Sequence, residues 1–159
     1  MRGMKVLVAY DSRKGTTRAV AERIALIAQG STADVTVSHV GAIAPGDAAG
    51  VDVLFLGAWT HGMFVVGVGP SDGAVRWAGG LPPLEGMLGA VFCTYDLNPR
   101  GTLTALASLL AAKGVLVAGS HASKRRNRLA GVDDFARDVM SQARRRSGQR
   151  SSGDRALRP

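Results

Sequence analysis

Five short apolar runs alternate along this chain with segments that have the periodicity of amphipathic helices. The first run starts at Lys5 and is continuously apolar to Tyr10, which is typical of a strand covered on both faces of a sheet. Strands that alternate with helices join through right-handed crossovers into a parallel sheet. The sequence therefore predicts a single α/β domain, doubly wound, with a five-stranded parallel sheet and helices on both faces.

The expected strands cover residues 5–10, 34–38, 51–57, 87–93 and 115–119. The expected helices begin at Thr16 or Thr17, at Thr102 and at Val132, with a short helix or loop over 45–50. Residues 58–83 are rich in Gly and Pro and have only patchy helix potential, around residues 72–77. The last helix is expected to end near Arg146, and the predicted domain covers residues 1–146. Residues 147–159 have nothing apolar to bury, so we expect a disordered basic tail.

The positive charge of this chain is concentrated at its C-terminal end. Residues 1–123 hold 9 basic and 8 acidic side chains, whereas residues 124–159 hold 11 basic and 4 acidic ones, and the total is +8. A basic domain surface would indicate nucleic acid as a partner. Here the basic tail explains the charge, so nucleic acid is not an expected partner.

The single cysteine, Cys93, excludes an internal disulfide framework and any multi-cysteine metal site. No apolar stretch approaches the roughly 20 residues of a membrane-spanning helix. The apolar run after Met4 is too short for a signal peptide with its cleavage site. We therefore expect a cytoplasmic protein without a membrane span.

In a doubly wound sheet, ligands bind beyond the carboxyl ends of the strands. This rule singles out three loops, at residues 11–17, 58–63 and 94–100. The first loop offers hydroxyls, a glycine and the N–H groups of a helix N-terminus, which together suit a phosphate. The same residues also fit an ordinary helix cap with a turn, and they form neither a P-loop nor a dinucleotide fingerprint.

Three segments carry a resemblance to the flavodoxin-like family. Residues 5–21 contain the family's loop of the form [ST]-x-x-G-x-T after the first strand, residues 52–62 resemble its third strand and flavin loop, and residues 92–95 resemble its second flavin loop. The resemblance implies the strand order 2-1-3-4-5 and FMN as the cofactor.

The resemblance also implies the positions that hold the cofactor. The phosphate would lie in the loop after the first strand, the flavin ring between the other two loops, and Asp96 and Asn98 at its pyrimidine edge. The candidate cofactor-binding residues are Ser12, Arg13, Lys14, Gly15, Thr16, Thr17, Ala58, Trp59, Thr60, His61, Gly62, Thr94, Tyr95, Asp96 and Asn98. No catalytic residue and no metal ligand is predicted.

This chain departs from the family in four respects. Arg13 and Lys14 place positive charge in a phosphate loop that is usually neutral, and residues 63–83 contain no clear long helix. Flavodoxins are typically strongly acidic, and this chain is not. His61 stands where the family often has an aromatic residue, with Trp59 two positions earlier, so the identity of the stacking ring stays open.

Apart from these departures, basic residues 124–128 follow the fifth strand, which we expect on the same sheet edge as the flavin site but far from the switch point. They form a solvated face or a docking surface for an anionic partner or substrate.

The leading functional interpretation is a redox protein that binds FMN. It is either an electron carrier with a redox partner protein or a small oxidoreductase with a quinone-like acceptor. Whether the chain is an enzyme therefore stays open. The sequence also leaves the choice between monomer and dimer open. The alternative is an interaction module on the same fold without a cofactor.

Overall fold

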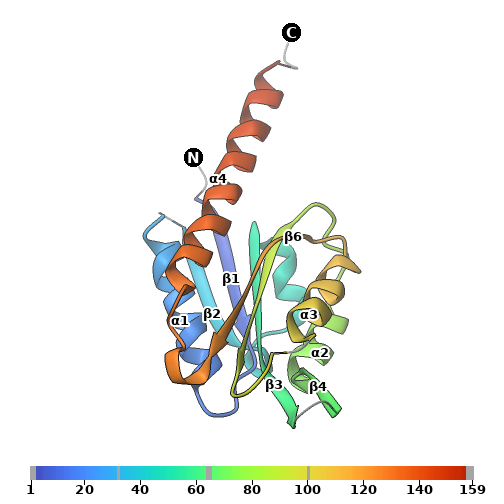
Figure 1. Ribbon diagram of the computed structural model, residues 1–159. Coiled ribbons are helices and arrows are strands. Elements are labelled where there is room, and N and C mark those ends of the chain that lie inside the picture. Colours follow the sequence, from blue (N-terminus) through green and yellow to red (C-terminus); the bar gives the residue numbers. More distant parts are fainter. Residues whose placement is uncertain (1–2, 32, 64–65, 100, 157–159) are drawn as a thin grey trace.

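The predicted alternation of strands and helices produces a central parallel sheet (Figure 1). Its strands are β1 (Lys5–Tyr10), β2 (Asp34–His39), β3 (Val53–Met63), β5 (Leu88–Tyr95) and β6 (Leu116–Lys124). They are hydrogen-bonded in the order β2-β1-β3-β5-β6, which confirms the predicted topology. The computed structural model describes residues 3–31, 33–63, 66–99 and 101–156.

The prediction of five strands missed a sixth, and it placed the ends of two others too early. β4 (Val66–Pro70) pairs antiparallel with β3, which continues past Gly57 to Met63. β6 likewise continues past Gly119 to Lys124. The extension of β3 contains Thr60 and His61, and that of β6 contains Ser120, His121 and Ser123. These polar residues break the apolar pattern, although both extensions stay paired with neighbouring strands.

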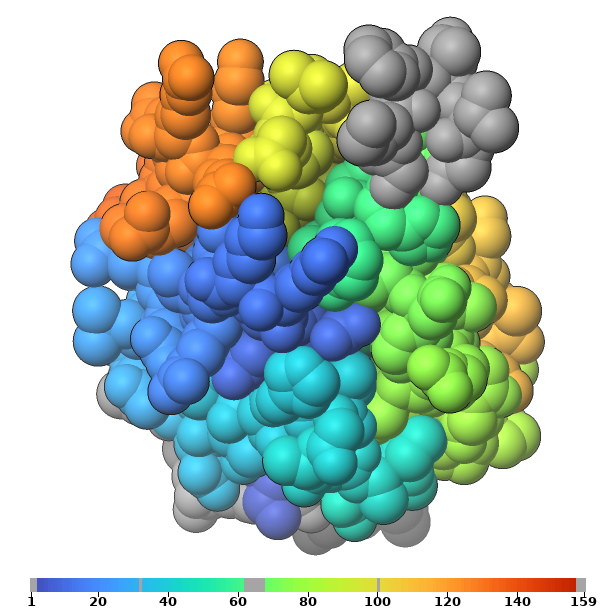
Figure 2. Space-filling model, turned by 90° about the horizontal axis from the view of Figure 1, so that it is seen from below, coloured from blue at the N-terminus to red at the C-terminus, as the bar shows by residue number. Residues whose placement is uncertain are grey.

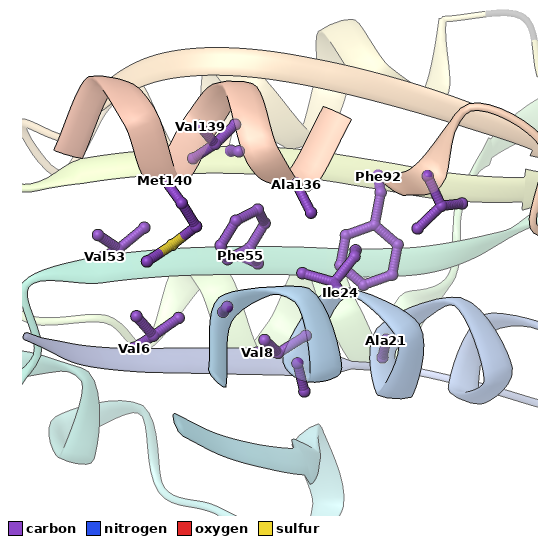
Figure 3. Packing of buried hydrophobic residues seen from close by; sticks show 14 of the residues in the cluster. Val6, Val8, Ala21, Ile24, Val53, Phe55, Phe92, Ala136, Val139 and Met140 are labelled. Carbon is purple, nitrogen blue, oxygen red and sulfur yellow. The ribbon is translucent and has the colours of Figure 1, made fainter. Parts of the chain in front are cut away.

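Two helices cover each face of the sheet. α1 (Thr16–Gln29) and α4 (Val132–Ala156) pack on one face, and α2 (Asp72–Gly79) and α3 (Thr102–Ala111) pack on the other. Short 3-10 helices lie at Val40–Ala42, Pro45–Gly50 and Arg125–Asn127. Figure 3 shows the core beneath α1 and α4, where Ile24 and Met140 meet Phe55 from the sheet. The prediction of helices on both faces is confirmed.

The sheet is packed closely at Gly57, in the centre of β3. A Cβ atom on this residue would lie 2.1 Å from the ring of Phe92, which is fully buried on the neighbouring strand β5. The absence of a side chain at Gly57 is therefore what admits the Phe92 ring.

The C-terminal helix differs from its prediction. α4 continues to Ala156 and projects beyond the sheet (Figure 1), whereas we expected residues 147–159 to be disordered. All described residues from Ser147 onward are exposed. No proline interrupts the backbone hydrogen bonds of the helix over residues 147–156. Residues 157–159 lie outside the described residues.

Among the described residues, no helix has the length and hydrophobicity needed to cross a bilayer.

Candidate functional site

A cavity of about 240 Å³ lies at the carboxyl edge of the sheet, which is the lower edge in Figure 1. Ligands of doubly wound folds bind at this edge. The loop after β1, the extension of β3, the end of β5 and the residue after β6 all contribute to it. Its lining consists of Ser12, Arg13, Lys14, Thr16, Thr17, Trp59, Thr60, His61, Thr94, Tyr95, Asp96 and Arg125.

The loop after β1 turns into α1 at Gly15. This residue has φ +88° and is the N-cap of the helix, with no side-chain cap, so the prediction of Thr16 or Thr17 as the cap is wrong. The backbone N–H of Gly15 donates to Oγ of Ser12 over 3.1 Å, which closes the turn. The first N–H groups of a helix have no carbonyl partner within it, and the helix dipole adds positive potential there. The turn therefore presents donors suited to an anion.

The start of α1 is joined to the end of β5 by two buried hydroxyls. Oγ1 of Thr17 lies 2.7 Å from Oγ1 of Thr94, and the two residues are 1% and 4% exposed. This hydrogen bond sets the position of the loop after β1 relative to the loop after β5. Thr17 thus has a structural partner besides any ligand.

The extension of β3 brings two rings to the cavity. Trp59 and His61 alternate with Thr60, so they share one side of the strand, and their ring centroids lie 6.0 Å apart. The guanidinium of Arg13 lies over the indole of Trp59, 5.5 Å from its centroid, as a cation–π contact. Residues 58–63, predicted as a loop, are held as a strand by β4, with the backbone N–H of Ser71 donating to the carbonyl of Trp59 over 3.1 Å.

The end of β5 supplies Tyr95 and Asp96, and the residue after β6 supplies Arg125. Nη1 of Arg125 lies 3.6 Å from Oδ1 of Asp96. We expected the fifth strand to lie far from the switch point, yet Arg125, directly after β6, lines the cavity. It reaches the cavity because β6 continues past Gly119, with Lys124 opposite Tyr95 of β5.

Four predicted residues are not among those that line the cavity. Gly15 shapes the turn, and Gly62 continues β3. Ala58 is fully buried in the core beneath α2 and α3, because strand alternation turns it away from Trp59. Asn98 lies in the loop after β5. Arg125 is the lining residue that the sequence analysis did not include.

Two nearby side chains have structural partners. Nε2 of His39 lies 3.1 Å from Oδ1 of Asp11, and its Nδ1 accepts from the N–H of Gly41, so His39 supports the start of the loop after β1.

Burial raises the pKa of Cys93 to about 11, and a hydrogen bond with Thr60 offsets this rise only in part. Because the thiolate is the reactive form of cysteine, the buried Cys93 serves as a packing residue.

The lining of this cavity fits a phosphate joined to a flat ring. The helix N-terminus, Ser12 and Thr16 supply donors for a phosphate, Arg13 and Lys14 supply positive charge, and Trp59 and Tyr95 supply aromatic surface. Within the described ranges, no group of three or more His, Cys, Asp or Glu side chains is placed to hold a metal ion.

A larger cavity, of about 420 Å³, lies at the opposite edge of the sheet, where α4 leaves it. Asp52, Glu85 and Arg146 are among its lining residues, and Arg146 donates to the carbonyl of Gly86 over 2.9 Å. No aromatic side chain is among its described lining residues. It therefore lacks the surface on which a flat ring would stack.

Comparison with known proteins identifies the fold. A solution structure of two-electron reduced flavodoxin from Megasphaera elsdenii matches at 22% identity with a TM-score of 0.74, covering 86% of this chain and 98% of that one. Oxidised flavodoxin 1 from Bacillus cereus matches at 17% identity with a TM-score of 0.71, covering 86% of this chain and 97% of that one.

A larger protein contains a similar unit. Rubredoxin oxygen:oxidoreductase from Desulfovibrio gigas matches at 17% identity with a TM-score of 0.72, covering 88% of this chain but 36% of that one. No family model matches this chain, and no curated protein does either. The structural matches show that the chain has a flavodoxin-like fold.

Proposed function

We propose that this protein binds FMN in the cavity at the carboxyl edge of the sheet and carries electrons between partner proteins. The observation that carries the proposal is the convergence of the α1 N-terminus with Trp59 and Tyr95 around one cavity. The fold is that of flavodoxins, and one similar structure is a two-electron reduced flavodoxin. FMN, when bound, supplies the redox chemistry, and the protein supplies binding, orientation and electrostatics.

The phosphate end of the cofactor would lie against the loop after β1. The N–H groups at the start of α1 and the hydroxyls of Ser12 and Thr16 would donate to its oxygens. Arg13 and Lys14 would add positive charge, which attracts the phosphate and is screened by salt. Gly15 permits the left-handed turn that aims these groups at one point.

The ring end would lie between the extension of β3 and the end of β5. Trp59 and Tyr95 offer aromatic faces, His61 lies beside Trp59, and Asp96 with the backbone up to Asn98 would read the polar edge of the ring. The cavity of about 240 Å³ is smaller than the ~300–1,000 Å³ of sites that enclose a ligand. The ring would therefore keep an exposed edge, which electron transfer to a protein partner requires.

A quinone-like acceptor is the second candidate, because the same exposed edge would admit a small planar molecule. Stopped-flow mixing of the photoreduced, FMN-loaded protein distinguishes the two. Fast oxidation by a one-electron protein acceptor and slow oxidation by a soluble naphthoquinone support the carrier. Fast oxidation by the naphthoquinone alone would contradict it and favour an oxidoreductase.

If the chain is instead an interaction module without a cofactor, the purified protein will not retain flavin.

A location in a reducing compartment such as the cytoplasm fits the single cysteine, Cys93, which is buried.

A further inference from the structure

We propose that the basic cluster after β6, formed by Lys124, Arg125, Arg126 and Arg128, is the docking surface for an acidic redox partner protein. The inference rests on the proposed carrier function and names the chemistry of the partner. The sequence allows this surface to be either a solvated face or a docking surface, and the similar structures give it no role.

The cluster lies next to the candidate flavin cavity. Asp96 and Arg125 line that cavity and also an adjoining depression, whose other lining residues are Leu97, Lys124, Arg126 and Arg128. Figure 2 views this edge, where the orange segment after β6 lies beside the yellow segment after β5 and close to the blue loop after β1. A partner seated in the depression would therefore reach the rim of the flavin cavity.

The charge of this surface is strongly one-sided. All four cations of the cluster are exposed, and Asp96 is the one carboxylate among the described residues that line the depression. The Asp96–Arg125 pair is 3.6 Å long, with 67% and 49% of the two side chains exposed. Exposed pairs of this kind stabilise by only ~0–1 kcal/mol, so a carboxylate on a partner can replace Asp96 at little cost. Arg13 and Lys14 extend the positive rim around the cavity.

A protein surface fits this depression better than a small anion or a nucleic acid does. The cations are exposed rather than enclosed, whereas sites for small molecules surround their ligand. Leu97 is 80% exposed in the depression, and an apolar residue among charges is typical of a protein interface. None of the described residues that line the depression is aromatic, so none of them offers a ring on which a nucleic-acid base could stack.

Electrostatic docking of this kind sets the rate of encounter more than the final affinity. Complementary charges steer diffusing proteins together and orient them, and salt weakens the effect. A carrier needs fast association and fast release, which an open, charged surface with one apolar contact provides.

The test is an NMR titration of the ¹⁵N-labelled full chain with an oxidised plant-type [2Fe–2S] ferredoxin as the acidic probe. We expect shifts or broadening of the amides of residues 96–97 and 124–128 at low salt, and their loss at high salt. Cytochrome c, a basic redox protein, is expected to leave these amides unchanged. The proposal is overturned if cytochrome c perturbs them equally, or if a short DNA duplex binds them as tightly as the ferredoxin does.

Variants with reversed charges test whether the basic cluster itself binds the ferredoxin. We expect the variant Lys124→Glu/Arg126→Glu/Arg128→Glu to bind the ferredoxin about tenfold more weakly, since steering changes association by ~10-fold or more. The control Arg144→Glu/Arg145→Glu/Arg155→Glu, on exposed positions of α4, is expected to stay within about twofold of the unmodified protein. Equal affinities for the two variants would contradict the proposal. The single variants Lys124→Gln and Arg126→Gln are expected to weaken ferredoxin binding in the same direction but by less. They replace the triple variant in this test if the triple variant does not fold.

This titration needs no bound flavin, so its outcome is separate from that of the proposed function. Retention of FMN without ferredoxin binding at residues 124–128 overturns the docking surface alone. Ferredoxin binding at these residues without FMN retention overturns the carrier function and leaves a surface for acidic proteins.

Discussion

The hydroxyl of Thr17, in the first turn of α1, and the hydroxyl of Thr94, near the end of β5, form a buried hydrogen bond of 2.7 Å. The two residues are 77 positions apart in the sequence. Their contact holds the loop that precedes α1 at a fixed distance from the loop that follows β5. The candidate flavin cavity lies between these two loops, so its width depends on this bond.

Replacing both of these hydroxyls should cost less stability than the sum of the two single replacements. Thr94→Val leaves the hydroxyl of Thr17 buried without a partner, which costs ~1–3 kcal/mol of the free energy of unfolding. Thr17→Val/Thr94→Val removes both polar groups and should be less destabilised than the sum of the two single variants. Chemical denaturation of the four proteins measures this coupling, and strictly additive losses would show that the bond contributes nothing.

The hydroxyl of Thr16 should discriminate between flavins with and without a phosphate. Thr16→Val is expected to weaken FMN binding roughly ten- to hundredfold, because a hydrogen bond to a charged group contributes ~1.5–3 kcal/mol. Riboflavin, which has no phosphate, should bind both proteins equally. Fluorescence titration measures both affinities, with Thr104→Val, an exposed change on α3, as the control. Equal loss for the two flavins would refute phosphate binding at Thr16.

The indole of Trp59 should contribute to binding of the flavin ring. We expect Trp59→Leu to weaken FMN and riboflavin binding alike, by roughly three- to tenfold, since an aromatic pair contributes ~0.5–1.5 kcal/mol beyond the area it buries. Parallel titrations of both flavins show whether the loss is shared. Unchanged affinity for both would remove Trp59 from the site and leave Tyr95 as the aromatic face.

The close contact between Gly57 and Phe92 should make β3 intolerant of a side chain at this position. Gly57→Ala would place a methyl group within 2.1 Å of the Phe92 ring, and overpacking of a core costs ~1–3 kcal/mol or more. Gly79→Ala, at the end of α2, meets no atom within 4 Å and is the matched control. Thermal unfolding compares the two, and a stable Gly57→Ala protein would show that Phe92 has room to move.

His121 should make stability dependent on pH. Burial lowers the pKa of this histidine, which stacks on Phe135 at 5.5 Å, so the folded protein favours the neutral ring. The unfolded chain then binds more protons between the lowered pKa and the ordinary value near ~6.5. This contribution to stability is therefore complete above the ordinary value and is lost as the pH falls through the folded pKa.

The variant His121→Gln isolates this effect. Between neutral and mildly acidic pH, the melting temperature of the unmodified protein should fall more steeply than that of the variant. Melting curves at several pH values give the difference between the two slopes. Parallel slopes would mean that His121 is as accessible to protons in the folded protein as in the unfolded chain.

The alternation of strands and helices could be predicted because apolar runs such as Lys5–Tyr10 reveal it directly, and the strand order came from the resemblance to the flavodoxin-like family. The strand ends at the carboxyl edge could not be predicted. There Thr60, His61 and Ser123 interrupt the apolar pattern, and the strands continue through pairing with neighbours that are distant in the sequence.

The candidate site likewise contains residues that the sequence reveals and residues that only the fold brings together. The loop after β1 was identified because its glycine and hydroxyls are adjacent in the sequence. Arg125 was missed because its place beside Asp96 depends on the length of β6 and on a register that no local pattern encodes. Ala58 was grouped with Trp59 but does not line the cavity, because in a strand, unlike a loop, adjacent residues point to opposite faces.

The proposed function requires that the cavity between the loops after β1 and β5 binds FMN. The most direct measurement is the visible absorption spectrum of the purified protein after it is mixed with FMN and desalted. We predict that the two flavin bands are retained at one flavin per chain. A colourless protein after desalting would contradict the claim and would favour an interaction module on a flavodoxin-like fold.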